Sequence, residues 1–483
     1  MRKTKKIVAM LLCGMMMLGT LAGCQNQSAT DSKGTENQQT SSEATTGTQN
    51  TESTGSSTNS ETVENVEKTW KDAFTEEQMK NFYNAAIKIG YTESFKYTTK
   101  GYTVGSGEAA EQVVYFFDLV HEKFPNAEFV KIEDENDTAA IVAANFDIVF
   151  GLNTYSLQNL KAASALKEYA PEWAEEVGVN LNDDDNMYSA IAKEMIISVY
   201  RVTGTVTDSA DVPKHQDKET FGGMDVTGLT DVSDLWKEGS AYLGKYELDK
   251  YMNDWSDLFN KTFLVGLLNK YIDTTATDTD CVSAEGWAML QAMIDGRSKE
   301  WVNEETKKGV TNTGAYINNY SNTVISIDGA SNAIDKMAWY WAAGKAARMD
   351  VAEYGAVPAY VYGVAITNTT ANAEAAQLFV DYIGSAAVVS EMAKHVRTLI
   401  PANKTVFNET NVKELDENGS GAEYKDYTNA LDADGNKIVR IIPTRQYMLS
   451  VSQMEAQDIN WDVVCKYVDA WVARANAMTT TGE

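Results

Sequence analysis

Short β-rich runs alternate with amphipathic helical segments along most of this chain of 483 residues. The alternation begins with strand 97–104, helix 113–124, strand 129–132, helix 138–144 and strand 147–150. Within the first helix the apolar residues recur at steps of four, three and four, the period of one helical face: Val113, Phe117, Val120 and Phe124. This βαβαβ order predicts a parallel sheet covered by helices, preceded by a helical lead-in at 76–89.

A second block follows the β-branched run 195–202, which we expect to carry the chain out of the first domain. Its predicted elements are helices at 232–237, 255–271 and 284–295, a strand at 324–327 and another at 360–366, a helix capped by Asn372, and a C-terminal helix at 461–475. The whole body, about residues 70–478, shows no repeat at solenoid or propeller spacing.

The N-terminal residues have the layout of an export signal. Arg2, Lys3, Lys5 and Lys6 precede an uncharged apolar run that is too short to span a bilayer permanently. The run ends in Leu-Ala-Gly-Cys at 21–24, which resembles the bacterial lipobox. That resemblance implies cleavage after residue 23 and acylation of Cys24 with fatty acyl chains such as palmitate.

A polar tether follows the lipidation motif. From Gln25 to Thr62 there is no Val, Leu, Ile, Met or aromatic residue, so the segment cannot bury enough apolar surface to offset its ordering entropy. We therefore predict a lipid-anchored disordered linker at 24–69 that holds the body outside the cell membrane.

Composition excludes several classes of function. The net charge is −28, whereas proteins that grip phosphate backbones carry clustered Lys and Arg, so we predict no nucleic-acid partner. The three histidines, His121, His215 and His395, are too far apart for a local metal or catalytic motif, and we predict neither a metal site nor a cofactor. Cys281 and Cys465 are the cysteines left to pair, and the sequence leaves their pairing open.

The order of elements resembles the extracellular solute-binding proteins of bacterial ABC importers, with the type II periplasmic-binding-protein-like fold. The strings that carry the resemblance are residues 104–108, 146–155, 358–366 and 371–383. The resemblance implies an α/β fold of two lobes with a hinge, in which the chain passes between lobes more than once. On that basis the first lobe holds 70–195 and 358–395, and the second holds 196–357 and 396–483.

Two groups of candidate ligand residues follow predicted strands of the first lobe. Ser106, Gly107 and Glu108 lie where a strand meets a helix, so free backbone N–H groups could meet a polar ligand; a plain capping turn is the alternative. A second group lies at a carboxyl-terminal strand edge, where open α/β sheets bind ligands: Asn153, Thr154 and Tyr155. The alternative for this second group is a solvated loop.

The second lobe and the return strand supply the other candidates. Asp328, Gly329 and Ser331 lie just past a predicted strand, although Asp-Gly is also a common turn pair. Tyr360 and Tyr362 alternate along a strand and share one face, which either lines the cleft or packs in the core. The acidic run 183–185 is interpreted as a solvated loop, since adjacent like charges repel unless a cation intervenes.

The sequence thus predicts a monomeric, extracytoplasmic lipoprotein that is not an enzyme. It would capture a small polar solute, with a sugar favoured, and deliver it to ABC permease subunits after hinge closure. Two alternatives remain: a secreted lipoprotein hydrolase that cleaves glycans with two carboxylates, and a ligand-sensing lipoprotein that feeds a membrane kinase.

Overall fold

The computed structural model describes residues 75–98, 112–115, 120, 123–201, 204–205, 220–221, 224–248, 254–275, 280–298, 323–333, 349–352, 354–395, 399–406 and 451–481. The chain divides into two units, Met1–Asn65 and Val66–Glu483, and every described residue belongs to the second. The predicted signal, Cys24 and the whole predicted linker at 24–69 therefore lie outside the described residues.

The described elements of the first half of the chain are α1 (Glu76–Tyr83), β1 (Lys88–Tyr91), η1 (Glu93–Phe95), β2 (Lys96–Thr98), β3 (Gln112–Tyr115), β4 (Glu128–Lys131), α3 (Thr138–Ala143), β5 (Ile148–Asn153), α4 (Thr154–Ala162), β6 (Leu166–Lys167), η2 (Glu172–Glu176), β7 (Ser189–Arg201), β8 (Gly204–Thr205) and β9 (Thr220–Phe221). Those of the second half are η3 (Val232–Leu235), β10 (Tyr246–Leu248), α5 (Leu258–Leu268), η4 (Asn269–Tyr271), α6 (Ala284–Gly296), β11 (Ile325–Gly329), β12 (Met349–Val351), β13 (Ala359–Thr367), α9 (Ala373–Ile383), α10 (Ala386–His395) and α13 (Trp461–Thr481).

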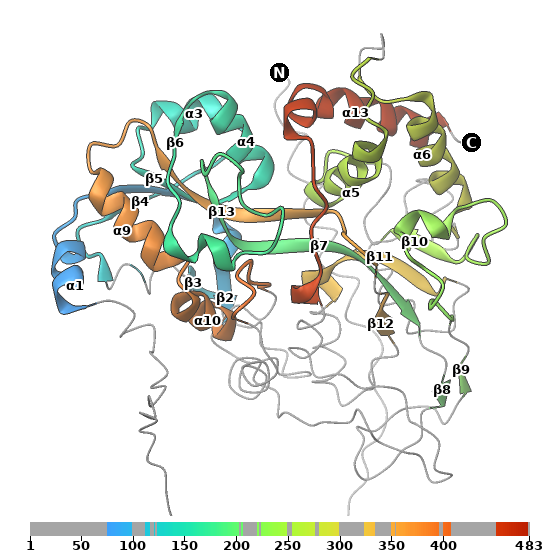
Figure 1. Ribbon diagram of the computed structural model, residues 1–483, viewed down its shortest axis with the longest axis horizontal. Helices are drawn as coiled ribbons and strands as arrows, with labels where there is room; N and C mark the ends of the chain where they lie inside the picture. The colour runs from blue at the N-terminus through green and yellow to red at the C-terminus, as the bar shows by residue number, and fades with distance from the viewer. Residues whose placement is uncertain are drawn as a thin grey trace, which may run out of the picture. The chain divides into compact units, whose positions relative to one another are not determined.

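Nine of the described strands form one mixed sheet. Among the described residues its main path runs β10-β11-β7-β13-β5-β1-β4, with β12 paired to β7 and β6 to β13. β1 is parallel to both β4 and β5, whereas β13 is antiparallel to β5 and to β7. Figure 1 shows β7 and β13 running side by side from the region of α3, α4 and α9 to the region of α5 and α13.

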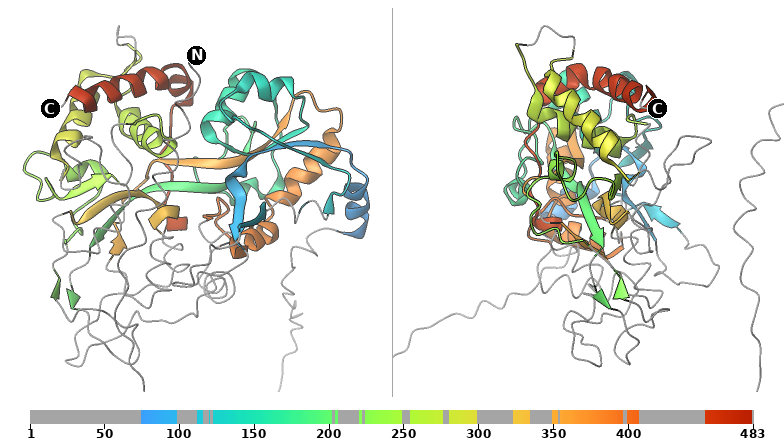
Figure 2. Two further views of the ribbon diagram at one scale, coloured as in Figure 1. Left: turned by 180° about the vertical axis from the view of Figure 1, so that it is seen from behind. Right: turned by 90° about the vertical axis from the view of Figure 1, so that its right-hand side faces the viewer.

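Two hydrophobic cores lie on this sheet, and they define two lobes. The first lobe packs Ile148, Phe150 and Phe124 against Phe379 and Tyr382 of α9. The second lobe packs α5, α6 and α13 against β10 and β11 (Figure 2). β7 contributes Met195 to the first core and Ile196 to the second, so the chain is an α/β protein of two lobes joined by shared strands, as predicted.

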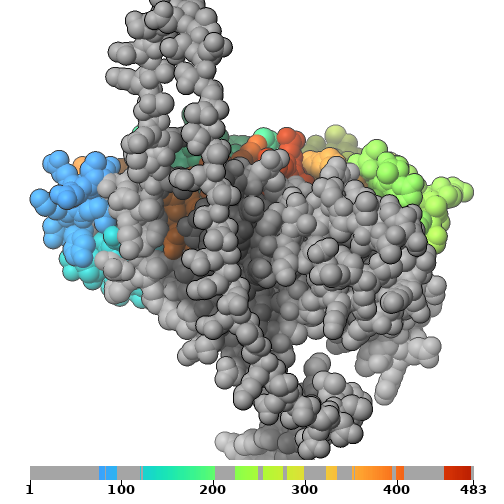
Figure 3. All heavy atoms as spheres, turned by 90° about the horizontal axis from the view of Figure 1, so that it is seen from below, coloured from blue at the N-terminus to red at the C-terminus, as the bar shows by residue number. Residues whose placement is uncertain are grey.

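The chain passes between the lobes several times. It leaves the first core through β7, returns through β13 and crosses again before α13, whose residues Val464 and Trp471 are buried in the second core. Figure 3 shows α1 (blue) and the segment near β10 (green) at opposite sides of the body. The exact lobe boundaries stay a prediction. Leu399, Ile400, Ala402 and Val406, which the sequence placed in the second lobe, are buried in the first core.

The N-terminal elements differ from those predicted. The lead-in helix ends at Tyr83, and Lys88–Tyr91 is the first strand of the main sheet. Residues 96–98 form β2, which pairs with β3 outside that sheet. Because β3 spans Gln112–Tyr115, the helix predicted over 113–124 is wrong at residues 113–115. Hydrophobic periodicity did not predict β1, because this strand is only four residues long and contains Gly90. A glycine is needed there, since a Cβ at this position would lie 2.7 Å from the ring of Phe146.

Other predicted elements are confirmed with shifted ends. β4, α3, β5, α6, β13 and α9 form where predicted, and α4 begins at Thr154, directly after β5. The segment 232–235 is a 3-10 helix, and α13 extends to Thr481. Asn372 precedes α9, but its side chain makes no capping hydrogen bond. Its Nδ2 donates to the carbonyl oxygen of Ala86.

A prediction tests the packing of α9. The residue after this helix is Gly384, and a Cβ there would lie 2.0 Å from Cζ2 of Trp173, whose Nε1 donates to the carbonyl oxygen of Val380 at 3.1 Å. Gly384→Ala is expected to lower the free energy of unfolding by about 2 kcal/mol through overpacking, measured by urea denaturation.

Gly355→Ala is the matched control, because a Cβ at Gly355 meets no atom within 4 Å. Its free energy of unfolding should stay within about 0.5 kcal/mol of the parent value. Equal stability of the two variants would show that Trp173 does not pack on α9 as described.

None of the helices in the described part of the chain combines the length and the apolar character that crossing a membrane requires.

Candidate functional site

Polar and aromatic side chains gather around Glu194 on β7, where the strands shared by the two lobes meet. We call this group the Glu194 cluster; its members are Glu194, Asp328, Ser331, Tyr360 and Tyr362. Tyr360 is the direct cross-strand partner of Glu194, so their side chains share one face of the sheet. Asp328 lies near the end of β11, and Ser331 follows it.

The carboxylate of Glu194 is buried and held by neutral donors. Its Oε1 accepts a hydrogen bond from the backbone N of Ser331 at 2.9 Å, and its Oε2 accepts one from the Ser331 hydroxyl. Within the described part of the chain, no Lys, Arg or His nitrogen pairs with this carboxylate. Burial raises the pKa of Glu194 to about 7; the hydrogen bonds from Ser331 oppose the shift, and the nearby Asp328 carboxylate adds to it.

The two tyrosines form the aromatic side of the Glu194 cluster. The rings of Tyr360 and Tyr362 meet edge to face with centroids 5.5 Å apart, and their hydroxyls are hydrogen-bonded. Tyr360 is 8% exposed, whereas Tyr362 is half-buried. Burial raises the pKa of Tyr362 to about 12, and the carboxylates of Glu194, Glu135 and Asp257 also raise it. The predicted common face is thus confirmed, and it meets acidic groups.

Asn153 and Thr154 lie at the junction of β5 and α4. The Asn153 side chain caps α4 by accepting from the backbone N of Ser156 at 3.1 Å, and Asn153 pairs with Tyr362 across the sheet. Thr154 Oγ1 accepts from the backbone N of Val361 at 2.8 Å. Both side chains are buried, so the alternative of a solvated loop is wrong, and the strand runs directly into the helix.

Tyr155 does not present its ring for ligand stacking. It belongs to α4 of the first lobe, yet its side chain is buried in the second core and donates to Thr262 Oγ1 at 3.3 Å. Its ring meets Trp461 edge to face at 5.4 Å, and the Lys261 ammonium lies 4.3 Å from its centroid. Tyr155 therefore connects the lobes.

Asp328 and Gly329 are the last residues of β11, not residues beyond the strand as predicted. Both are paired with β7, opposite Ile197 and Ile196, so the alternative of a turn is also wrong. Asp328 is 1% exposed and accepts from Asn332 Nδ2 at 2.8 Å. A Cβ at Gly329 would lie 3.1 Å from Glu194 Oε1, so glycine leaves room for that carboxylate.

The remaining predicted contacts, Ser106, Gly107 and Glu108, fall outside the described residues. The first strand of the main sheet is β1, so the residues after it are Thr92 and Ser94. Their hydroxyls donate to the carbonyl oxygen of Gly151 at 2.5 and 3.0 Å. This loop therefore occupies the position after the first strand of the main sheet.

A separate polar cleft of about 710 Å³ opens elsewhere, and none of the predicted ligand residues lines it. Its residues come from 158–185, 269–274 and 458–462, and include Asp183 and Asp185. Both of these carboxylates pair with Lys161, at 2.7 and 2.8 Å. Asp183 is also 5% exposed, so the prediction of a solvated acidic loop is wrong there, and Lys161 is the intervening cation.

Sequence reasoning missed Glu194, Glu135, Asp257 and Lys261. Lys193 and Glu194 are charged residues inside an otherwise apolar run, and a charge in such a run is the signal that could have singled them out. Lys193 has a structural role, because its ammonium donates to the carbonyl oxygen of Ser452 at 2.7 Å.

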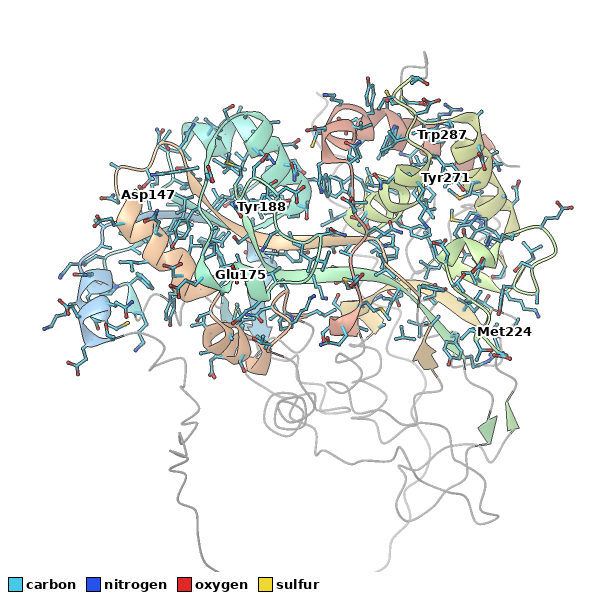
Figure 4. All side chains as sticks on the ribbon, viewed as in Figure 1. Asp147, Glu175, Tyr188, Met224, Tyr271 and Trp287 are labelled. Atoms are coloured by element: carbon cyan, nitrogen blue, oxygen red, sulfur yellow. The ribbon has the colours of Figure 1, made fainter. Side chains whose placement is uncertain are left out.

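The described residues were predicted to hold no metal ion, and the pairing of Cys281 with Cys465 was left open. Within the described residues, no group of three or more His, Cys, Asp or Glu side chains is placed to hold a metal ion. Cys281 and Cys465 are both free thiols, which answers the question that the sequence left open. Figure 4 labels Tyr188 near α4 and Trp287 on α6, one in each core.

Comparison with known proteins gives structural matches only. No family model and no curated protein matches the sequence. Apo FutA2 from Synechocystis PCC6803 is 12% identical, with a TM-score of 0.48 over 81% of this chain and 98% of that one. The apo ferric ion-binding protein A of Pasteurella haemolytica is 9% identical, with a TM-score of 0.48 over 83% and 100%.

A third solved structure is the spermidine/putrescine ABC transporter substrate-binding protein PotD from Streptococcus pneumoniae. It is 13% identical, with a TM-score of 0.42 over 81% of this chain and 99% of that one. Each of these three matches covers about four fifths of this chain.

Proposed function

We propose that this protein captures a small solute with a positively charged group between its two lobes and delivers it to an ABC permease. The observation that carries this proposal is the buried Glu194 carboxylate, which has only the neutral donors of Ser331 and the backbone beside it in the described structure. A buried anion without a cation is costly, and a ligand ammonium group would remove that cost.

The other side chains around Glu194 also favour a positively charged ligand. Asp328 adds a second buried carboxylate, and Glu135 and Asp257 act on the neighbouring Tyr362. Tyrosine rings and hydroxyls also suit an ammonium group, through cation–π contact and hydrogen bonding. A cationic solute would therefore find complementary charge and aromatic surface in one place.

The placement of the Glu194 cluster on shared strands supports capture by hinge closure. Glu194 lies on β7, which contributes residues to both cores, and the two tyrosines lie on β13, which pairs with β7. A solute that contacts residues of both lobes binds the closed state more tightly than the open one, and so shifts the population toward closure. A permease that recognises the closed state would then receive loaded protein.

Location rests on the sequence. The charged and apolar start, the lipobox-like motif ending at Cys24 and the polar tether after it support an extracytoplasmic protein anchored to the cell membrane by acyl chains. We propose that it works there as a monomer and without catalytic turnover.

The proposed solute, an amine, differs from the sugar that the sequence favoured. The sugar prediction came from the abundance of aromatic residues and of neutral hydrogen-bonding side chains. Among the candidate aromatic residues, Tyr155 is buried in the second core, and the Tyr360 and Tyr362 rings pack on each other. Sugar binding stays a prediction, whereas the charge around Glu194 supports an amine.

A ligand screen tests the proposal. The full chain would be mixed at pH 8 with alkyl amines, ferric citrate, sugars and organic acids, and melting temperature and calorimetric affinity would be recorded. Amines should raise the melting temperature and be recovered unchanged. A shift with sugars alone would restore the sugar prediction, and conversion of a glycan would favour the hydrolase.

A further inference from the structure

Lys261 of α5 holds a positive charge over the ring of Tyr155, the first-lobe residue that enters the second core. Its side chain is half-buried, and its ammonium lies 4.3 Å from the centroid of the Tyr155 ring. Within the described part of the chain, no carboxylate oxygen lies within 4 Å of this ammonium. Its described contact is thus with the face of an aromatic ring, a cation–π contact between residues of the two lobes.

Helix α5, which carries Lys261, packs beside the Glu194 cluster, since a Cβ at Gly329 would lie 3.1 Å from Glu194 Oε1 and 3.7 Å from Phe259 Cδ2. Burial lowers the pKa of Lys261, and the carboxylates of Asp469, Glu135 and Asp257 oppose that shift. Glu135 and Asp257 also act on Tyr362 of the Glu194 cluster. The ammonium and the cluster therefore share the same two carboxylates as neighbours.

Both shared carboxylates are fixed by backbone contacts. Glu135 Oε2 lies 3.5 Å from the backbone N of Asn153, at the start of α4. Asp257 is the N-cap of α5 and accepts from the backbone N of Phe259 at 3.1 Å. Lys261 lies one turn further along the same helix, so its charge is positioned relative to both groups.

We propose that Lys261 is a specificity-determining residue that limits how many positive charges the bound solute carries. This inference rests on the proposed function. The lysine ammonium supplies one resident positive charge to an acidic site. A solute with one ammonium group is accepted, and a second ammonium group on the solute is repelled by the one that the protein already holds.

The size of this discrimination follows from Coulomb interaction between two unit charges at the edge of a protein. With an effective dielectric constant of about 20, a separation of about 10 Å corresponds to roughly a tenfold change in affinity for each added charge. Replacing the ammonium should therefore change the relative affinity for singly and doubly charged amines by about this factor.

The test compares n-butylamine with 1,4-diaminobutane by isothermal titration calorimetry of the full chain at pH 8. Lys261→Met keeps an apolar stem over Tyr155 and removes the charge. It is expected to increase the affinity ratio of diamine to monoamine by about tenfold. Lys261→Arg keeps the charge and should leave that ratio within about twofold of the parent value.

The outcomes separate this inference from the proposed function. If the parent chain binds amines and both variants keep the parental ratio, Lys261 does not set charge selectivity, and this inference fails alone. If neither amine binds the parent chain, the proposed function fails and the inference fails with it. Should Lys261→Met not fold, as judged by circular dichroism, Lys261→Gln replaces it under the same criterion.

Discussion

Replacing Glu194 with Gln is expected to weaken amine binding by about a hundredfold at pH 8, because a buried charge partner is worth roughly 3 kcal/mol. At this pH Glu194 is ionised, since its pKa is raised to about 7, and an alkyl amine carries its proton. Gln keeps the size of the side chain, and its amide can still contact the backbone N and hydroxyl of Ser331. Calorimetric titration with n-butylamine measures the loss.

The matched control is Glu176→Gln. Glu176 also accepts hydrogen bonds from neutral donors, Asn403 Nδ2 at 2.7 Å and the Thr405 hydroxyl at 3.2 Å, but it is exposed. Amine affinity in this variant should stay within about twofold of the parent value. If Glu194→Gln binds amines as tightly as the control does, Glu194 is not the counter-ion, and the buried carboxylate has a purely structural role.

The stability of the parent chain is expected to fall by about 3 kcal/mol through Glu194 alone as the pH rises from about 4.5 to above 7. The folded-state pKa of Glu194, about 7, lies above the ordinary value of 4.5, so within this window the folded state holds a proton that the unfolded state has released. The free energy of unfolding therefore decreases with pH until the folded state also ionises.

Urea denaturation at several pH values, without ligand, measures this effect as the difference between the parent chain and Glu194→Gln. Other titrating groups, such as Asp381, whose pKa is raised by burial, act equally in both proteins and cancel. The difference should change by about 3 kcal/mol across the window. A difference that stays constant with pH would mean that Glu194 ionises as an exposed carboxyl does.

Binding and stability at this carboxylate are opposed. The ionised Glu194 that attracts a cation is also the state that destabilises the free protein, because its charge is buried and no described basic side chain pairs with it. A bound ammonium group would recover that stability by mass action. The two predictions together thus test whether the cost of burying the charge serves ligand capture.

The periodic pattern determined those elements that have a uniform environment along their length. β5 and β13 were predicted from their apolar and β-branched runs, which are buried along most of each strand, and α9 from Ala375, Phe379 and Tyr382, which recur at helical spacing. The alternation of such elements predicted an α/β fold, and the resemblance to extracellular solute-binding proteins implied two lobes. Composition and the N-terminal motif pointed to an exported protein without any coordinates.

The tertiary structure decided the rest, because the groups concerned interact across long separations in the chain. β1 is four residues long and contains Gly90. A glycine is required there because Phe146, which is distant in the sequence, packs against it. Tyr155 looked available for a ligand until packing placed it in the second core. Glu194 meets Tyr360 through strand register and Ser331 through the end of β11, and a local pattern contains neither pairing. The sequence alone therefore determined the kind of fold, whereas long-range packing and register placed the acidic groups that give the proposed site its charge.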